Sequence, residues 1–314
     1  MIIDLRTESG YAKYTGLMQE ARRVVAHYFD VHENQLVITC GATGALQAVF
    51  SHMQKSTVAI MPFEYFDIFT FANLHKCTLL IAETKNDRQN DVAAFCQLIK
   101  ERSPDLVYVS LPNNPLGQHY SEEEVKMIID VLSDDQVCVF DQTLLTARPY
   151  AASFFRKWGA KKQIIIIGSF SKSHNLVNER IGYMFMPCRP VAFHPYAHAP
   201  AAQSLKKVMK VIGTSTYTDK VVAMIEANNA IIAAWAAEQA EFVWSESNTN
   251  FGVLHLRTMP IAVFAEQLKQ ANVLVKTSVD LKCPGNFLRV HLGQSSTSVR
   301  SFLKVLESQS FVSA

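Results

Sequence analysis

The sequence of 314 residues predicts an α/β protein, with a large domain around a mainly parallel seven-stranded sheet and a small α+β C-terminal domain. Seven short apolar segments alternate with patterns of helical periodicity, which is typical of a parallel sheet covered by helices. Most of these segments are apolar on both faces, as expected for buried strands. A long helical stretch then leads to a shorter region with its own strands and helices. The predicted strands of the large sheet cover residues 36–40, 58–61, 77–81, 106–110, 137–140, 164–167 and 181–186.

The first part of the chain has a lead-in over 1–13 and an amphipathic helix over 14–29. The strand over 36–40 runs directly into Gly-Ala-Thr-Gly at 41–44, and a helical pattern follows. A turn between a strand and a helix start can bind an anion. The next strand ends at Pro62, and another helical pattern begins near Tyr65.

The second part of the chain begins with one long helix, predicted over 215–244 as a bridge between two domains. We therefore divide the chain into an N-terminal segment 1–13, a large domain 14–214, an interdomain helix 215–245 and a small domain 246–314. Within the small domain, strands are expected at 253–256 and 287–291, and helices at 261–271 and 297–307.

The composition excludes several classes of function. Hydrophobic residues make up 49% and charged residues 18%, which fits a packed globular protein. The net charge is only +2 and no basic run occurs, so we expect no nucleic-acid and no membrane partner. The sequence has no pattern of a leader peptide or a membrane span, so we expect a cytoplasmic protein. Six scattered cysteines without a CxxC pair are expected to be reduced.

The most reactive candidate is Lys172, in the sequence Ser-Phe-Ser-Lys after the isoleucine-rich strand over 164–167. In α/β sheets, ligands bind at the carboxyl ends of strands, and this lysine follows such an end. A lysine there forms a Schiff base with an aldehyde if burial or neighbouring cations lower its pKa. Ser169, Ser171 and Arg180 are suited to bind a phosphate group nearby. The alternative is a surface lysine in a serine-rich turn.

Two further polar residues follow predicted strands at the same edge. Asp141 comes directly after the strand over 137–140, where a carboxylate can pair with a protonated pyridine nitrogen. Its alternative is a helix-capping or turn aspartate. Asn114, in Pro-Asn-Asn-Pro-Leu-Gly after the strand over 106–110, presents an amide to a phenolate oxygen or forms an ordinary Asn-Pro turn.

Taken in order, these motifs resemble fold-type I PLP-dependent enzymes of the class I/II aminotransferase family, most closely its histidinol-phosphate-aminotransferase-like branch. The resemblance covers nearly the whole chain. It rests on the turn at 41–44, the aromatic segment 62–66, Asn114, Asp141, Lys172, and Arg180 before Ile-Gly-Tyr. It implies the cofactor pyridoxal 5'-phosphate, α-amino acid and 2-oxo acid substrates, and a homodimer with a shared active site.

The resemblance also implies a role for each residue. Lys172 holds the cofactor as a Schiff base, Asp141 keeps its pyridine ring protonated, and Asn114 bonds the ring hydroxyl. Tyr65 stacks on the ring, with Phe66 as the second candidate. Arg289 matches the arginine that binds the substrate α-carboxylate, and its alternative is a solvated charge on a strand edge. The implied phosphate site consists of backbone N–H groups of Ala42 and Thr43, the side chains of Ser169, Ser171 and Arg180, and Tyr14 from the partner subunit.

The sequence departs from the family pattern at several positions. Leu144 stands where the family usually has a tyrosine that bonds the ring hydroxyl, and Asn178 replaces a common glycine before the phosphate arginine. The lead-in before Tyr14 is also shorter than usual. Other signals are weak: His194 and His198 lack a third zinc ligand, and His174 fits a local hydrogen bond as well as a substrate contact. No metal site is predicted.

We therefore interpret the chain as a cytoplasmic, homodimeric aminotransferase that moves an amino group between an α-amino acid and a 2-oxo acid. Alternatives on the same fold are a PLP-dependent decarboxylase, a lyase, an oxidase, or a non-catalytic protein. A dinucleotide oxidoreductase is a further alternative, because Gly41 and Gly44 have the spacing of two fingerprint glycines. Thr39 stands where the first glycine of that fingerprint belongs, so the match is partial.

Overall fold

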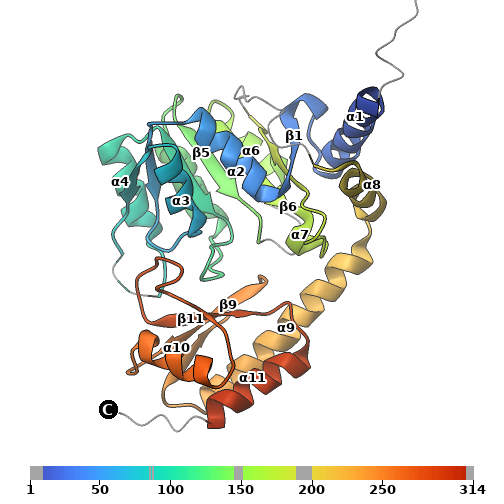
Figure 1. The fold of residues 1–314 in the computed structure, drawn as a ribbon. Helices are drawn as coiled ribbons and strands as arrows, with labels where there is room; N and C mark the ends of the chain where they lie inside the picture. The colour runs from blue at the N-terminus through green and yellow to red at the C-terminus, as the bar shows by residue number, and fades with distance from the viewer. Residues whose placement is uncertain (1–9, 85, 87, 145–150, 189–199, 309–314) are drawn as a thin grey trace, which may run out of the picture.

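The computed structural model describes residues 10–84, 86, 88–144, 151–188 and 200–308, and it confirms the predicted α/β fold (Figure 1). A seven-stranded sheet has the order β1-β7-β6-β5-β4-β2-β3, and a separate sheet has the order β10-β11-β9-β8. The strands of the large sheet are β1 (Leu36–Thr39), β2 (Thr57–Ile60), β3 (Thr78–Ile81), β4 (Leu106–Ser110), β5 (Val137–Asp141), β6 (Gln163–Ser169) and β7 (Gly182–Phe185).

The large sheet is mainly parallel, as predicted. Strands β3, β2, β4, β5 and β6 pair in parallel, and β7 is antiparallel to both of its neighbours. The register places Ser110 of β4 opposite Asp141 of β5, and Asp141 opposite Ile167 of β6. The carboxyl ends of these three strands therefore meet at one edge, where α/β sheets bind ligands.

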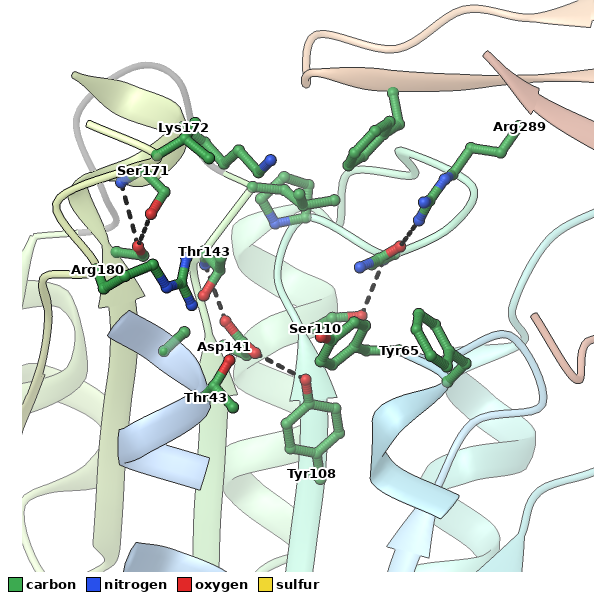
Figure 2. Close-up of a pocket in the computed structure, with 18 residues that line it drawn as sticks. Thr43, Tyr65, Tyr108, Ser110, Asp141, Thr143, Ser171, Lys172, Arg180 and Arg289 are labelled. Atoms are coloured by element: carbon green, nitrogen blue, oxygen red, sulfur yellow. Dashed lines mark hydrogen bonds between the residues drawn. The ribbon is translucent and has the colours of Figure 1, made fainter. Parts of the chain in front are cut away.

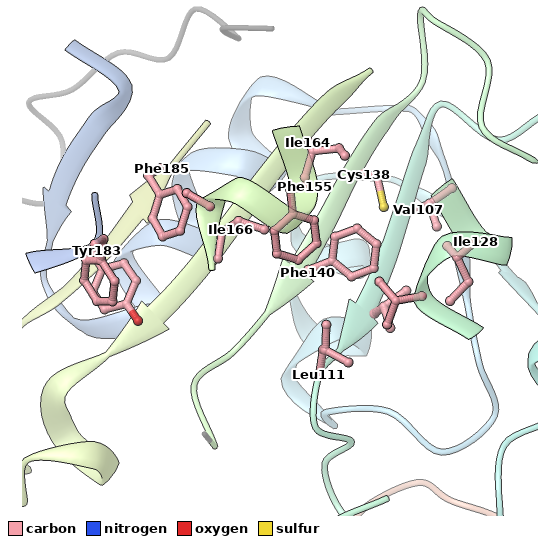
Figure 3. Packing of buried hydrophobic residues seen from close by; sticks show 14 of the residues in the cluster. Val107, Leu111, Ile128, Cys138, Phe140, Phe155, Ile164, Ile166, Tyr183 and Phe185 are labelled. Carbon is pink, nitrogen blue, oxygen red and sulfur yellow. The ribbon is translucent and has the colours of Figure 1, made fainter. Parts of the chain in front are cut away.

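Helices cover both faces of the large sheet. The isoleucine run of β6 explains why, because Ile164 and Ile166 pack on one face and Ile165 and Ile167 on the other. Figure 3 shows the first of these clusters, in which the tilted rings of Phe140 and Phe155 pack together beside Ile166. The helices and the 3-10 turn of this domain are α1 (Gly10–Tyr28), η1 (Glu33–Gln35), α2 (Gly41–His52), α3 (Asp67–Leu74), α4 (Val92–Arg102), α5 (Glu122–Val131), α6 (Ala152–Gly159), α7 (Phe170–Ser173) and α8 (Ala202–Val211).

The small domain is an antiparallel sheet with helices on its apolar side (Figure 1). The long helix α9 (Ser215–Ala237) leads into it from the large domain. The other elements are β8 (Phe242–Ser245), β9 (Phe251–Leu256), α10 (Ile261–Gln270), β10 (Lys276–Thr277), β11 (Phe287–His291) and α11 (Ser296–Ser308).

Two predicted elements are wrong in extent. The helix expected over 14–29 begins earlier, at Gly10, and ends at Tyr28. The helix expected over 215–244 ends at Ala237, and Phe242–Ser245 form strand β8, which the sequence analysis did not predict. Phe242 is 2% exposed and pairs with Leu256 in the register of β8 and β9. Its aromatic and β-branched neighbours favour a strand, and burial against the sheet decides the conformation. Strand β10 was also not predicted.

The two domains meet through a small apolar cluster. Phe63 and Leu116 of the large domain pack with Val253, Leu281 and Phe287 of the small domain. This contact fixes where the small domain lies relative to the strand ends of the large sheet. Among the residues that the structure describes, no helix has the length and apolar character needed to cross a membrane.

Candidate active site

A cavity of about 270 Å³ lies at the carboxyl edge of the large sheet, below the small domain (Figure 2). Its floor comes from the ends of β4, β5 and β6 and from the start of α2, and one wall comes from β9 and β11. The cavity brings together ten of the eleven predicted site residues: Ala42, Thr43, Tyr65, Asn114, Asp141, Ser169, Ser171, Lys172, Arg180 and Arg289.

Lys172 projects into this cavity from α7, the short helix that follows β6. Ser169 is the N-cap residue of this helix, and its hydroxyl oxygen accepts a hydrogen bond from the backbone N–H of Ser171 at 3.1 Å. Burial lowers the pKa of the Lys172 amine, and the cations Arg289 and Arg180 lower it further. A larger fraction of the amine is therefore neutral, which is the form that attacks an aldehyde.

A cup for an anion forms where α2 begins. Gly41 has a left-handed φ of 67°, and a Cβ there would lie 3.1 Å from Nη2 of Arg180. A Cβ on Gly182 would lie 2.5 Å from the carbonyl carbon of Gly41 and 2.8 Å from the backbone nitrogen of Ala42. Glycine at both positions thus lets the guanidinium and the helix start come together. The unpaired N–H groups of a helix start and an arginine favour a phosphate.

Ser169 at the end of β6 and Ser171 of α7 complete this cup. The hydroxyl groups of Ser169 and Ser171 are 2.9 Å apart, and both side chains line the cavity (Figure 2). Arg180 itself has a φ of 48°, in a region that non-glycine residues adopt at an energetic cost. Such strain is typical of residues that the surrounding structure holds for a function.

Asp141 lies at the end of β5 with both carboxylate oxygens engaged. Oδ2 accepts a hydrogen bond from the hydroxyl of Tyr108 at 2.8 Å, and Oδ1 accepts one from the backbone N–H of Thr143 at 2.9 Å (Figure 2). Burial raises the pKa of Asp141, and hydrogen bonds from Thr143 and Tyr108 act in the opposite direction. A protonated ring nitrogen beside this carboxylate would compensate for the burial of its charge.

Tyr108 was missed in the sequence analysis. It lies in the middle of β4 and is fully buried, and burial raises the pKa of its hydroxyl, so the group stays a donor. A buried tyrosine hydroxyl needs a hydrogen-bond partner, so a tyrosine within an apolar strand is a signal for one. Which residue serves as partner depends on the neighbouring strand, and the sequence alone does not reveal it.

Arg289 reaches the cavity from β11 of the small domain. Its Nη1 donates to Oδ1 of Asn114 at 3.1 Å, across 175 residues of sequence, and its guanidinium lies 4.0 Å from the centre of the Phe251 ring. Burial lowers the pKa of Arg289. Because its amide oxygen accepts this bond, Asn114 keeps its amide N–H groups for another acceptor in the cavity. Phe251, which separates Arg289 from Lys172, was not predicted.

Tyr65 and Phe66 line the same cavity, with ring centres 5.3 Å apart. The hydroxyl of Tyr65 donates to the carboxylate of Asp67, so this ring is held in one orientation. Leu144 is 4% exposed and also lines the cavity, where the family pattern has a hydroxyl donor. Beside it, the buried Oγ1 of Thr143 has no hydrogen-bond partner among the described residues.

Four residues considered in the sequence lie away from the cavity or outside the described part of the chain. Tyr14 does not line the cavity, and its hydroxyl donates to the carbonyl of Pro200 at 2.7 Å, so its role in a partner subunit stays a prediction. His174 bonds the hydroxyl of Ser173 at 2.8 Å and packs against Phe170, in line with a local role. The candidates His194 and His198 lie outside the described residues. Across the described ranges, no cluster of histidine, cysteine or carboxylate side chains suits a metal ion.

Comparison with known proteins identifies the family. Residues 2–304 match the sequence profile described as "Aminotransferase class I and II". The chain belongs to this family. The protein is therefore a PLP-dependent aminotransferase, an enzyme that acts on amino acids and 2-oxo acids.

Individual relatives are distant in sequence but similar over most of the chain. An aromatic amino acid aminotransferase from Corynebacterium glutamicum (strain R) is 23% identical over 239 residues, covering 72% of this chain and 69% of the relative. A histidinol-phosphate aminotransferase from Wolinella succinogenes is 24% identical over 303 residues, covering 91% of this chain and 79% of the relative. One similar solved structure is the crystal structure of histidinol-phosphate aminotransferase from Sinorhizobium meliloti in complex with pyridoxal-5'-phosphate. It superimposes with a TM-score of 0.75 at 16% identity and covers 92% of this chain and 82% of its own chain.

The residues of the cavity fit the cofactor of this family. The anion cup suits its phosphate, the Lys172 amine with its lowered pKa suits its aldehyde, and the buried carboxylate of Asp141 suits a protonated ring nitrogen. Alternatives without this cofactor, including a nicotinamide oxidoreductase, are not favoured by the family match.

Proposed function

We propose that this aminotransferase works with Lys172 as the cofactor-binding lysine, Asp141 as the partner of the ring nitrogen, and Arg289 as the ligand of the substrate α-carboxylate. One observation carries the proposal: a single cavity gathers these three side chains from β5, α7 and β11. When bound, pyridoxal 5'-phosphate supplies an aldehyde that condenses with amines and a ring that accepts electrons.

In this arrangement, Lys172 also moves the proton. Its amine lies 5.5 Å from the centre of the Phe251 ring, on the side of the cavity opposite Arg289. A substrate held by Arg289 would present its α-carbon to Lys172, whose lowered pKa increases the neutral fraction of an amine that can accept the α-proton. Asp141 would keep the ring nitrogen protonated, and Arg180 with the start of α2 would hold the phosphate.

An absorbance experiment tests this assignment. Purified protein with the cofactor should absorb at the violet edge of the visible spectrum. Adding an amino acid should reduce this absorbance and release the matching 2-oxo acid, and a second 2-oxo acid should restore it. Carbon dioxide without amino transfer would contradict the proposal and support a decarboxylase. Cofactor binding with no response to any amino acid would support a non-catalytic protein.

We also propose a homodimer with a shared active site. The support is the position of Tyr14 on α1, outside the cavity of its own chain, at the place in the sequence where the family's cross-subunit tyrosine is expected. If Tyr14→Phe is inactive, mixing it with Lys172→Ala should yield hybrids in which one site carries both changes and the other carries neither. Confirmed hybrids that regain no activity would contradict the shared site.

A cytoplasmic location and the four-part division of the chain remain parts of this proposal. All six cysteines are unpaired thiols, which fits a reducing compartment. The names of the relatives suggest aromatic amino acids and histidinol phosphate as the first substrates to test.

A further inference from the structure

A second buried carboxyl group, Glu64, lies behind the cavity and has no part in the function proposed above. Glu64 is 0% exposed and lies between β2 and α3, one residue before Tyr65. It does not line the cavity, whereas its neighbour Tyr65 does. A buried carboxyl group is costly unless its oxygens are well bonded, so its partners indicate what it is for.

The Glu64 carboxyl group ties two turns of the large domain together. Its oxygens accept hydrogen bonds from the backbone N–H of Ser110 at 3.1 Å and from the hydroxyl of Ser110 at 2.5 Å. They also accept a longer bond from the backbone N–H of Tyr65 at 3.3 Å. Ser110 is the last residue of β4, so Glu64 links the turn after β2 to the turn after β4.

Ser110 in turn forms a hydrogen bond with Asn114. Its hydroxyl oxygen accepts bonds from the backbone N–H of Asn114 at 3.0 Å and from the side-chain amide of Asn113 at 3.2 Å. A hydroxyl has one donor and two acceptor positions, so donation to Glu64 completes its capacity. Asn114 in turn accepts from Arg289 at 3.1 Å (Figure 2). A continuous chain of hydrogen bonds therefore runs from Glu64 to the arginine of the small domain.

The charges around Glu64 do not neutralise it. In the described part of the chain, no salt bridge includes it, and the titratable groups that interact with it are Asp141, Tyr108, Tyr120 and Cys283. Burial raises the pKa of Glu64 to about 8, the bonds from Ser110 and Tyr65 oppose this shift, and the Asp141 charge adds to it. The pKa of this carboxyl group therefore lies above neutral pH.

We propose that Glu64 is a positioning residue of this active site, which holds Asn114 through Ser110 and fixes Tyr65 beside it. The inference rests on the proposed role of the cavity in binding the cofactor. The ionised form suits this hydrogen-bond pattern best, since both carboxylate oxygens accept bonds from Ser110 and protonation of either oxygen would weaken its bonds. Protonation should therefore loosen Asn114, and cofactor affinity should rise as Glu64 ionises.

The test measures the dissociation constant of pyridoxal 5'-phosphate from pH 6.5 to 9.5 by absorbance. Glu64→Ala should weaken binding by about tenfold at pH 8.5 and remove the component of the pH profile near 8, because Ser110 loses its acceptor. Glu64→Gln keeps one acceptor oxygen and no titrating group. It should recover most of the affinity while its profile lacks the same component, which separates Glu64 from the titration of Lys172.

Two further variants distinguish positioning from general stability. Glu241→Gln is the control: this small-domain carboxylate also accepts several bonds, from Thr258 and Met259, and its loss should leave cofactor affinity unchanged. A double-mutant cycle of Glu64→Ala with Asn114→Ala should be non-additive if Glu64 acts through Asn114. Additive effects on cofactor affinity would overturn the inference.

Ser110→Ala keeps the experiment decisive if Glu64→Ala does not fold. This variant should also weaken cofactor binding and lose the titration near pH 8. If Ser110→Ala binds with wild-type affinity and an unchanged pH profile, the link is overturned. Wild-type protein that binds no cofactor would refute the proposed function instead, whereas an active wild type with unaffected variants would refute this inference alone.

Discussion

The floor and the small-domain wall of the cavity are built in different ways. The floor residues lie at the ends of strands of one hydrogen-bonded sheet, whose register sets their spacing: Asp141 ends β5, Lys172 follows β6 and Arg180 precedes β7. The wall residue Arg289 belongs to a separate sheet and meets the floor through Asn114 and the apolar contact between the two domains. The floor is therefore fixed by strand pairing, and the position of the wall depends on how the two domains pack.

This difference also appears in the chemistry. The floor carries the carboxylate, amine and anion cup that suit the cofactor, whereas the wall offers a planar cation above an aromatic ring. Changes in the floor should alter cofactor chemistry, and changes in the wall should alter substrate binding. The following predictions test this division, beginning with the largest expected effect.

Lys172→Ala should abolish turnover, with a loss of at least about 10⁴-fold, because the variant lacks both the covalent attachment and the proton-transfer group. The fold should remain, since the side chain contributes little to the core. Borohydride reduction followed by mass spectrometry checks the covalent attachment. A reducible adduct between the variant and the cofactor would show that another lysine carries the reaction.

Asp141→Asn should still bind the cofactor but lose on the order of 10²- to 10³-fold in kcat, because a neutral amide does not hold a proton on the ring nitrogen. Steady-state kinetics and cofactor absorbance measure the two effects. Tyr108→Phe is a matched variant that removes one hydrogen bond to Asp141, and it should cost only several-fold. Near-normal turnover of Asp141→Asn would refute the role given to this carboxylate.

Arg289→Lys should act on the wall alone. The loss of a bidentate hydrogen bond to the substrate carboxylate should raise the KM for the amino acid by about tenfold to 10²-fold, with cofactor affinity nearly unchanged. Arg257→Ala, which changes an exposed arginine directly after β9, is the control and should leave KM within about twofold. If Arg289→Lys weakens cofactor binding as much as substrate binding, the floor and the wall do not have separate roles.

Leu144→Tyr should have the smallest effect of these changes, and it tests whether the floor lacks a hydroxyl donor. A phenol beside the ring oxygen would stabilise its ionised form, so the pKa read from the absorbance of the bound cofactor should fall by about one unit or less. Titration of the absorbance against pH checks this direction. An unchanged pKa, with normal cofactor binding, would mean that another group such as Thr143 already supplies the bond.

The sequence by itself determined the succession of strands along the chain and the polar residues near their ends. Apolar strands over 137–140 and 164–167 end at Asp141 and just before Ser169, and parallel pairing brings such ends to one edge. These signals are local, since each consists of an apolar run, a turn and a polar residue. For the same reason the fold class was predicted correctly, and most of the residues predicted for the site line one cavity, although their roles stay predictions.

Only the tertiary structure decided which side chains meet. The bond between Arg289 and Asn114 joins residues 175 positions apart, and the contact of Tyr108 with Asp141 depends on the pairing of β4 with β5. Strand β8 forms because Phe242 is buried against β9, although the preceding sequence continues a helical pattern. Glu64 reads as an ordinary charged residue in the sequence. Its burial and its bonds to Ser110 exist because two strand ends that are distant in sequence pack side by side.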